Sequence, residues 1–331
     1  MGKNIYVFAE QRDGKVQRVA LELLGKAREL ADTLGQQVVA ILAGDNISGE
    51  AKDLIKRGAD KVVIIDDPAL KEYLTEPYAK AVTAAIQKYE PEIVLFGATS
   101  IGRDLAPRVS ARIHTGLTAD CTALEIDPET KLLQMTRPAF GGNIMATIVC
   151  EKHRPQMATV RPGVMEMMAA DDSRDGEIKL FVVPFGENEA AVKIREVVRE
   201  TKKTEDITEA KMIVSGGRGM GCKDNLSHLK NLAEALGASV AASRAVVDAG
   251  WIDKERQVGQ TGKTVRPDLY LACGISGAIQ HVAGMEDAEF IIALNTDAKA
   301  PIFKTADLGI VGDACEILPK LTEKIKAYKA E

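Results

Sequence analysis

The chain has 331 residues, 46% of them hydrophobic, which is enough for two domains with a core each. Its 43 basic and 48 acidic residues give a formal net charge of -5, and no basic stripe stands out, so nucleic-acid binding is not expected. The five cysteines are widely spaced and form no Cys-x-x-Cys pair, which argues against iron–sulfur and structural zinc sites and favours a reducing compartment.

No apolar segment approaches the roughly 20 residues of a membrane span. The first apolar run follows the initial methionine almost directly, without the features of a signal or transit peptide. We therefore expect a cytoplasmic protein.

The first part of the chain alternates short apolar runs with amphipathic stretches. Apolar residues from Val16 to Leu34 fall on one helical face. This βαβ alternation predicts a mostly parallel sheet with helices on both faces. Strands are expected at residues 5–9, 38–43, 62–65 and 93–97, and further helices at 48–57, 77–89 and 103–113.

The pattern changes after Thr118, where turn sequences separate strands expected at residues 119–126, 132–137, 143–150 and 156–160. They predict extra, partly antiparallel strands at one edge of the first sheet. A charged tract follows at residues 195–209, with almost no apolar periodicity. We place the boundary there, which gives an N-terminal domain of residues 1–203 and a C-terminal domain of residues 204–331.

The second half again alternates strands and helices. The whole chain is therefore predicted to be an α/β protein of two doubly wound domains, the first with extra edge strands. Strands are expected at residues 211–214, 239–242, 269–273 and 290–294, and helices at 226–236, 277–283 and 314–328.

The most informative segment is residues 271–285, which predicts a buried strand, a glycine turn and a helix opened by Ser276 and Gly277. Gly274 and Gly277 let the backbone approach a ligand, and the first amides of the helix would point at it with the positive end of the helix dipole. Such a turn suits a pyrophosphate. The competing interpretation is an ordinary strand-to-helix turn, in which the glycines serve only tight packing.

Other nucleotide and catalytic motifs do not fit. Gly262-Lys263-Thr264 resembles the end of a P-loop, but Gln257 stands where that motif requires glycine. The glycine cluster at residues 216–221 lacks the Gly-x-Gly-x-x-Gly spacing, although it suits a loop that carries Arg218 against a flat ring. The four histidines have no ligand partners at metal-binding spacing, and no Gly-x-Ser-x-Gly elbow is present, so we expect neither a metal site nor a catalytic nucleophile.

Five blocks of the second half, at residues 214–220, 242–250, 257–263, 271–285 and 300–303, carry a family resemblance. Their sequences include Gly-Gly-Arg-Gly-Met, Ala-Ser-Arg-Ala, Val-Gly-Gln-Thr-Gly and Gly-Ile-Ser-Gly-Ala-Ile-Gln-His. In this order they resemble the FAD-binding half of the alpha (large) subunit of electron transfer flavoproteins. The resemblance implies an electron carrier more than an enzyme, with one FAD in its C-terminal domain, for which the residues after about 207 should suffice.

The resemblance also implies roles for single residues. Arg244 matches the arginine beside the isoalloxazine, where a fixed positive charge favours the anionic semiquinone. Thr261 matches the residue whose hydroxyl bonds flavin N5, and His281 matches the one near the pyrimidine oxygen, where a donor stabilises charge gained on reduction. Position 296 is Thr, where some members have lysine.

The resemblance implies further residues that contact the cofactor. They are Val258, Gly259 and Gln260 beside Thr261, the pyrophosphate turn of Ser276, Gly277, Ala278, Ile279 and Gln280, and further contacts at Arg218, Ser243, Gln257, Asn295 and Asp313.

The first half resembles the alpha subunit's N-terminal domain more loosely, best at residues 102–108 and 115–121. The family implies that this domain packs on a beta subunit and binds no flavin, with an acyl-CoA dehydrogenase or a similar enzyme as redox partner. The beta subunit holds AMP in simple carriers and a second, NADH-oxidising FAD in electron-bifurcating ones. Residues 136–146 look more like the bifurcating branch, and residues 201–209 are expected to be a hinge.

The residues alone leave an alternative open. The chain could be an adenine-nucleotide-binding α/β protein, such as a stress or adenylating module without flavin. Its active part would then lie at the strand ends of the first half.

Overall fold

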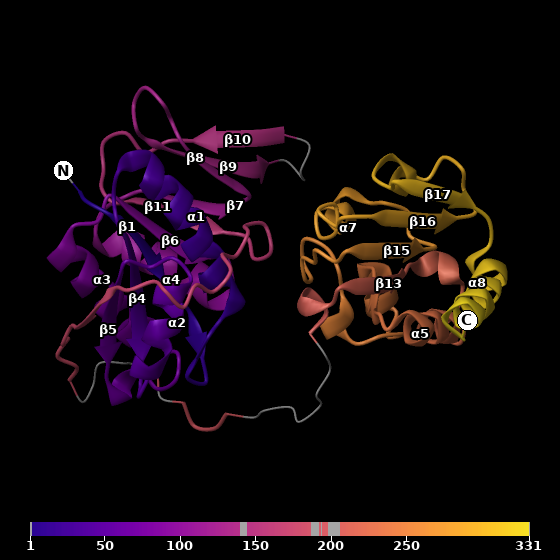
Figure 1. Cartoon of the computed structure of the whole chain (residues 1–331), viewed down its shortest axis with the longest axis horizontal. Coiled ribbons are helices and arrows are strands. Elements are labelled where there is room, and N and C mark those ends of the chain that lie inside the picture. The colour runs from indigo at the N-terminus through magenta and orange to yellow at the C-terminus, as the bar shows by residue number, and fades with distance from the viewer. Residues whose placement is uncertain (1, 140–143, 187–191, 193, 198–205, 331) are drawn as a thin grey trace. The chain divides into compact units, whose positions relative to one another are not determined.

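The structure is a computed structural model, which describes residues 2–139, 144–186, 192, 194–197 and 206–330. The chain divides into two compact units, Met1–Val198 and Arg199–Glu331. Each is built around one parallel sheet with helices (Figure 1). The prediction of an α/β chain with two such sheets is confirmed.

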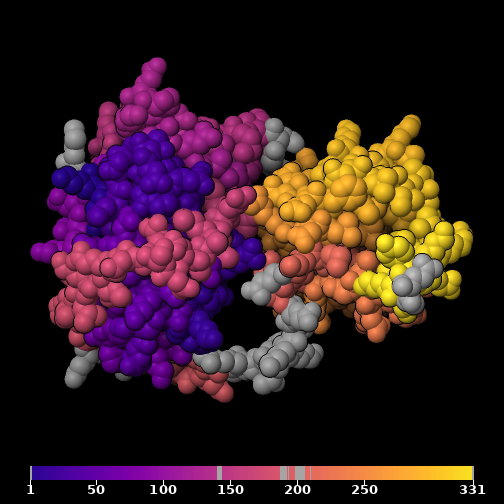
Figure 2. Space-filling model, in the orientation of Figure 1, coloured from indigo at the N-terminus to yellow at the C-terminus, as the bar shows by residue number. Residues whose placement is uncertain are grey.

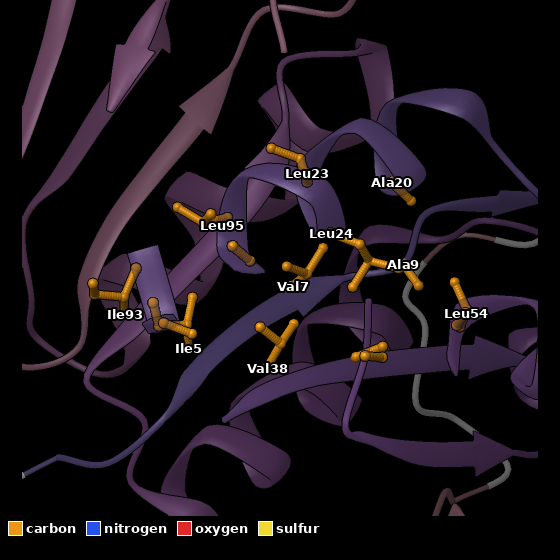
Figure 3. Close-up of a cluster of buried hydrophobic side chains, with 14 of the residues drawn as sticks. Ile5, Val7, Ala9, Ala20, Leu23, Leu24, Val38, Leu54, Ile93 and Leu95 are labelled. Atoms are coloured by element: carbon orange, nitrogen blue, oxygen red, sulfur yellow. The ribbon is translucent and has the colours of Figure 1, made fainter. Parts of the chain in front are cut away.

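The first unit centres on a parallel sheet ordered β12-β5-β4-β1-β6-β11-β7. Successive side chains of a strand point to opposite faces, so each strand supplies two cores. Ile5 and Val7 face α1 and α2, as Figure 3 shows for Val7 beside Leu24. Tyr6 and Phe8 face α3 and α4.

The bounds of these elements agree with the expected runs to within a few residues, except at the edges of the sheet. The strands are β1 (Ile5–Phe8), β4 (Val38–Gly44), β5 (Lys61–Asp66), β6 (Ile93–Gly97), β7 (Leu117–Cys121), β11 (Gln156–Val160) and β12 (Glu177–Leu180), and the helices are α1 (Arg18–Leu34), α2 (Ala51–Lys56), α3 (Thr75–Tyr89) and α4 (Ser100–Arg112).

The edge strands differ from the prediction. The run expected at residues 119–126 divides after Cys121, and its second part, β8 (Ala123–Ile126), joins β9 (Leu133–Ala139) and β10 (Ile144–Ile148) in a separate antiparallel sheet. The expectation that residues 156–160 are an added edge strand is wrong, because β11 lies between β6 and β7 and is parallel to both. All five of its residues are buried, as is typical of an interior parallel strand.

Two strand features of the first unit have no counterpart in the sequence analysis: β12 and the hairpin of β2 (Gln11–Arg12) with β3 (Lys15–Val16). All four residues of β12 are exposed, so no apolar alternation marks the strand. The chain reaches this far edge by running over α1 and α2, where the Gly163 amide donates to Glu22 and the Asp171 amide donates to the Lys56 carbonyl. This segment is the pink band across the first unit in Figure 2.

The second unit centres on a parallel sheet ordered β14-β13-β15-β16-β17. Helices α5 and α8 cover one face, and loops carrying Ile207, Val258, Ile275 and Ile302 cover the other. The strands are β13 (Met212–Gly216), β14 (Ser239–Ala242), β15 (Leu269–Cys273), β16 (Ile291–Asn295) and β17 (Leu308–Val311), and the helices are α5 (Leu226–Leu236), α6 (Arg244–Asp248), α7 (Ile279–Val282) and α8 (Ala314–Ala330).

Several connections contain a short 3-10 helix. These lie at Ser48–Glu50, Pro68–Leu70, Ile207–Glu209, Arg218–Met220, Lys254–Arg256 and Pro301–Lys304.

A fragment of residues 204–331 should fold alone, and a fragment that begins at residue 208 should be less stable. Ile207 is fully buried in the core of the second unit, and Lys263 Nζ donates to the Asp206 carboxylate at 2.9 Å. Loss of the Ile207 side chain should lower the free energy of unfolding by about 2–5 kcal/mol. Urea titration followed by fluorescence measures it, because the only tryptophan, Trp251, lies in this unit.

The control is Leu308→Ala in the longer fragment, since Leu308 is 47% exposed. This variant should change stability little. Equal stability of the two fragments would contradict the role of Ile207.

Candidate functional site

The second sheet has its topological switch point between β13 and β15. From β13 the chain moves outward to β14 and then returns to the other side of β13 as β15. Ligands of open α/β sheets bind beyond the carboxyl ends of the strands at such a point. A cavity of about 750 Å³ lies here, lined by Arg218 after β13, Ser243 after β14, Ser276 after β15 and Asn295 at the end of β16. Its volume is within the roughly 300–1,000 Å³ of small-molecule sites.

The loops after β13 and β15 cross backbone to backbone. The Gly219 amide donates to the Gly274 carbonyl at 2.9 Å, and a Cβ added to Gly217 would lie 2.1 Å from the same oxygen. No side chain fits between the loops at these positions. Gly217 and Gly219 therefore serve this crossing, and Arg218 and Gly219 also line the cavity.

Six consecutive backbone amides, those of residues 275–280, donate to no protein acceptor in the part of the chain that the structure describes. They follow β15 directly and form one wall of the cavity through Ile275, Ser276, Ala278 and Gln280. Unpaired amides that gather at a strand-to-helix turn are typical of sites for phosphate and other anions.

The helix expected over residues 277–283 is shorter than predicted. α7 covers Ile279–Val282 only, which is about one turn. A single turn has few aligned peptide dipoles, so the free amides and not a helix dipole provide most of the positive potential. The anion-binding character predicted for this segment thus rests on another physical cause.

Gly277 serves tight packing. Its φ is +85°, and an added Cβ would lie 2.2 Å from the Ile302 nitrogen. The Ile302 amide in turn donates to the Ser276 carbonyl at 3.1 Å. Gly277 therefore has a packing role, whereas Gly274 of the same turn lines the cavity.

Gln257 orients Thr261. The Gln257 side chain is buried, and its Nε2 donates to Thr261 Oγ1 at 3.0 Å. Because the threonine oxygen accepts this bond, its own proton remains available for an acceptor in the cavity. The loop is held against α7 by the Gln260 amide, which donates to the Gln280 carbonyl at 2.6 Å.

His281 lines the cavity with a ring that is almost fully buried. Its Nδ1 lies 3.1 Å from the Val258 carbonyl oxygen and its Nε2 lies 3.0 Å from the Tyr270 hydroxyl. Burial lowers the pKa of His281 to about 4, against a smaller opposite effect of the Val258 carbonyl. The ring is therefore neutral near pH 7 and, with both nitrogens engaged, has no spare N–H for the role that the resemblance implies.

Arg244 and Asp248 form an ion pair at the rim. They lie one turn apart on α6, with Arg244 Nε 3.2 Å from an Asp248 carboxylate oxygen, and both line the cavity. Both side chains are largely exposed, so solvent weakens the pair. The sequence analysis omitted Asp248 as a site residue, although its i,i+4 spacing from Arg244 indicates the pairing.

The structure brings most of the predicted site residues together. Those that line the cavity are Arg218, Ser243, Arg244, Gln257, Val258, Gly259, Thr261, Ser276, Ala278, Gln280, His281 and Asn295. Lining residues that the sequence analysis did not name as contacts are Gly219, Ala245, Asp248, Gly274 and Ile275.

Four predicted residues, Gln260, Gly277, Ile279 and Asp313, are not part of the cavity lining. Asp313 instead accepts the Cys315 amide at 2.8 Å in the first turn of α8, which is the position of a helix N-cap. The Asp313 side chain stabilises the helix, and this contact is a structural reason for an acidic residue at position 313.

Among the described residues, no three His, Cys, Asp or Glu side chains gather in a way that could hold a metal ion. The described helices also include none that is both long and apolar enough to cross a membrane.

Two family models match the chain. The model described as electron transfer flavoprotein domain covers residues 5–185, and the model described as electron transfer flavoprotein FAD-binding domain covers residues 206–286.

Similar curated proteins span nearly the whole chain. The electron transfer flavoprotein subunit alpha of Thermoanaerobacterium thermosaccharolyticum is 56% identical over 99% of both chains, and that of Clostridium acetobutylicum is 53% identical over 98% of this chain and 97% of its own. The lactate dehydrogenase (NAD(+),ferredoxin) subunit LctC of Acetobacterium woodii is 46% identical over 98% of this chain and 77% of its own length.

The buried His281 should make stability depend on pH. The unfolded histidine binds a proton near pH 6.5 and the folded one only near pH 4. The stability that depends on the neutral His281 is therefore fully present above about pH 6.5 and decreases as the pH falls towards about 4. Urea unfolding across this interval should show a steeper decline for the wild type than for His281→Gln. His228→Gln, outside the cavity, is the control for loss of a histidine, and equal slopes for wild type and His281→Gln would rule out this assignment.

Proposed function

The chain belongs to the electron transfer flavoprotein family as an alpha subunit with a FAD-binding domain, and on that premise we propose that residues 204–331 hold the FAD in the cavity beside β13 and β15. The row of free amides at residues 275–280 is the observation that carries this assignment. Proteins of this family transfer electrons, and their alpha subunits work with a beta subunit. Residues 1–203 form the domain that we assign to contact with that subunit.

The residues present fit a flavin dinucleotide. The amides of residues 275–280 and the Ser276 side chain suit the pyrophosphate, whose two charges need several donors. Thr261, with its hydroxyl proton free, and Arg244 would lie on the side of the flavin ring. Bound FAD supplies the one-electron and two-electron redox chemistry, and the chain supplies position and charge.

The adenine-nucleotide alternative loses its physical basis in the first unit. Its sheet has a switch point between β1 and β6, where such a nucleotide would bind. The Glu10 carboxylate is buried there, accepts a hydrogen bond from Thr99 Oγ1 and pairs with Arg12. A buried carboxylate repels a phosphate, so this position favours the FAD assignment to the second unit.

We also infer that the complex is electron-bifurcating, with a second FAD and no AMP on the beta subunit. The name of the relative LctC contains both NAD(+) and ferredoxin, and splitting an electron pair requires two such redox partners. Residues 136–146 support the same branch. Their described part forms the paired ends of β9 and β10, with Ile144 and Met145 each 54% exposed, and residues 140–143 lie outside the described residues.

Two finer assignments belong to the same proposal. An acyl-CoA dehydrogenase or a similar flavoenzyme is the redox partner. Residues 201–205 of the hinge expected at residues 201–209 lie outside the described residues. From Asp206 onward the chain is attached to the second unit.

Arg244→Ala should lower the one-electron potential of bound FAD by tens of millivolts. A guanidinium near the ring stabilises its negatively charged reduced forms, and about 1.4 kcal/mol corresponds to roughly 59 mV for one electron. Spectroelectrochemical titration of the FAD-loaded heterodimer measures the shift. Arg266→Ala removes an arginine of the same unit that pairs with Asp287 outside the cavity and is the matched control. A potential equal to that of the control would exclude Arg244 from this role.

Cofactor analysis of the heterodimer purified with its natural beta subunit tests the bifurcation assignment. We expect two FAD and no AMP per heterodimer, with flavin reduction by NADH. One FAD and one AMP, without reduction by NADH, would identify a simple carrier. No FAD on the alpha chain at all would overturn the site assignment itself.

A further inference from the structure

The hydrogen bonds of His281 define its tautomer. A backbone carbonyl can only accept, so the contact of Nδ1 with the Val258 oxygen requires the proton on Nδ1. A neutral ring then has a lone pair on Nε2, and the Tyr270 hydroxyl, 3.0 Å away, must donate to it. The acceptor-only carbonyl of Val258 thus determines the donor and the acceptor in both hydrogen bonds of the neutral ring.

Tyr270 is placed to do this by the sheet. It is a fully buried residue of β15, and its ring centroid lies 6.1 Å from that of His281. β15 also leads into the free amides of residues 275–280. The strand that positions the anion site therefore positions the hydroxyl behind His281 as well.

We propose that Tyr270 is a positioning residue of the flavin site, which holds His281 as a neutral ring with its proton on Nδ1. This inference rests on the proposed function, because it is the flavin in the same cavity that would respond to a charge on His281. With Tyr270 in place, the histidine contributes no charge to the cavity near neutral pH. Without the hydroxyl, Nε2 becomes free to take up a proton when the flavin becomes negative.

The surroundings of His281 favour the neutral ring further. Its neighbours in the strand and loop are uncharged: the Val258 carbonyl, and the Tyr270 phenol with the Ser215 hydroxyl and the Cys273 thiol nearby. Burial raises the pKa of both Tyr270 and Cys273, so neither is ionised. The charged groups that line the same cavity are Arg218, Arg244 and Asp248, two cations against one anion.

The test is Tyr270→Phe in the full-length chain, which keeps the aromatic ring in the core and removes only the hydroxyl. Nitrogen-15 NMR of the histidines reports the tautomer and the pKa of His281 without reference to activity. In the wild type we expect an Nδ1–H tautomer at pH 7. In Tyr270→Phe we expect the pKa of His281 to rise by about one unit or more towards the ordinary value of about 6.5.

The FAD-loaded protein gives a second readout. As the pH falls from about 8 to 5, the midpoint potential of the flavin in Tyr270→Phe should rise more steeply than that of the wild type, because an imidazolium stabilises reduced flavin. The wild type should lack this contribution, and so should Tyr270→Phe combined with His281→Gln. Tyr328→Phe, an exposed tyrosine of α8, is the matched control and should behave as the wild type.

Three results would overturn the inference. One is a wild-type His281 that carries its proton on Nε2, or protons on both nitrogens, at pH 7. This measurement needs no variant, so it tests the inference even if Tyr270→Phe does not fold. The others are an unchanged His281 resonance in folded Tyr270→Phe and a difference from the wild-type pH profile of the potential that persists in the double variant. Absence of FAD binding by a chain with the expected tautomer would instead reject the proposed function and leave the hydrogen-bond assignment intact.

Discussion

The crossing of the two glycine loops after β13 and β15 is the constraint on which the rest of the site depends. The Gly219 amide meets the Gly274 carbonyl, and at Gly217 there is no space for even a methyl group. The amides of residues 275–280 begin where this contact ends, so their place relative to Arg218 is set by the crossing. A side chain here would separate the loops and move both the free amides and the arginine.

The two units show how the same kind of topological switch point can carry opposite chemistry. Both sheets wind outward from their first strand and then return to its other side. At that point the first unit places the buried Glu10 with Thr99, which also caps α4 by accepting the Gly102 amide. The second unit leaves the amides of residues 275–280 without acceptors among the residues that the structure describes. Fold topology therefore gives a switch point in both units, and the side chains and free donors there determine whether an anion can bind.

Sequence patterns predicted the elements that bury one clear face and failed where burial gave no pattern. α5 and β15 have the expected bounds because their apolar spacing follows helix and strand periods. β12 and β17 were not predicted, since their residues are mostly exposed and their pairing comes from a neighbouring strand. In the site, the glycine turn and Arg244 could be predicted from motifs, whereas Tyr270 could not, because a buried tyrosine in a strand looks like ordinary core until its hydroxyl partner is known.

The charges of the cavity differ in how they respond to pH. A guanidinium keeps its charge at any physiological pH, and Asp248 beside Arg244 reduces the field of that arginine. A histidine would normally be such a group, but burial lowers the pKa of His281 to about 4, and Tyr270 occupies the nitrogen that would gain the proton. An electron carrier works between partners of given potential, and a site whose charge stays constant around neutral pH adds no pH dependence of its own to the potential of the cofactor.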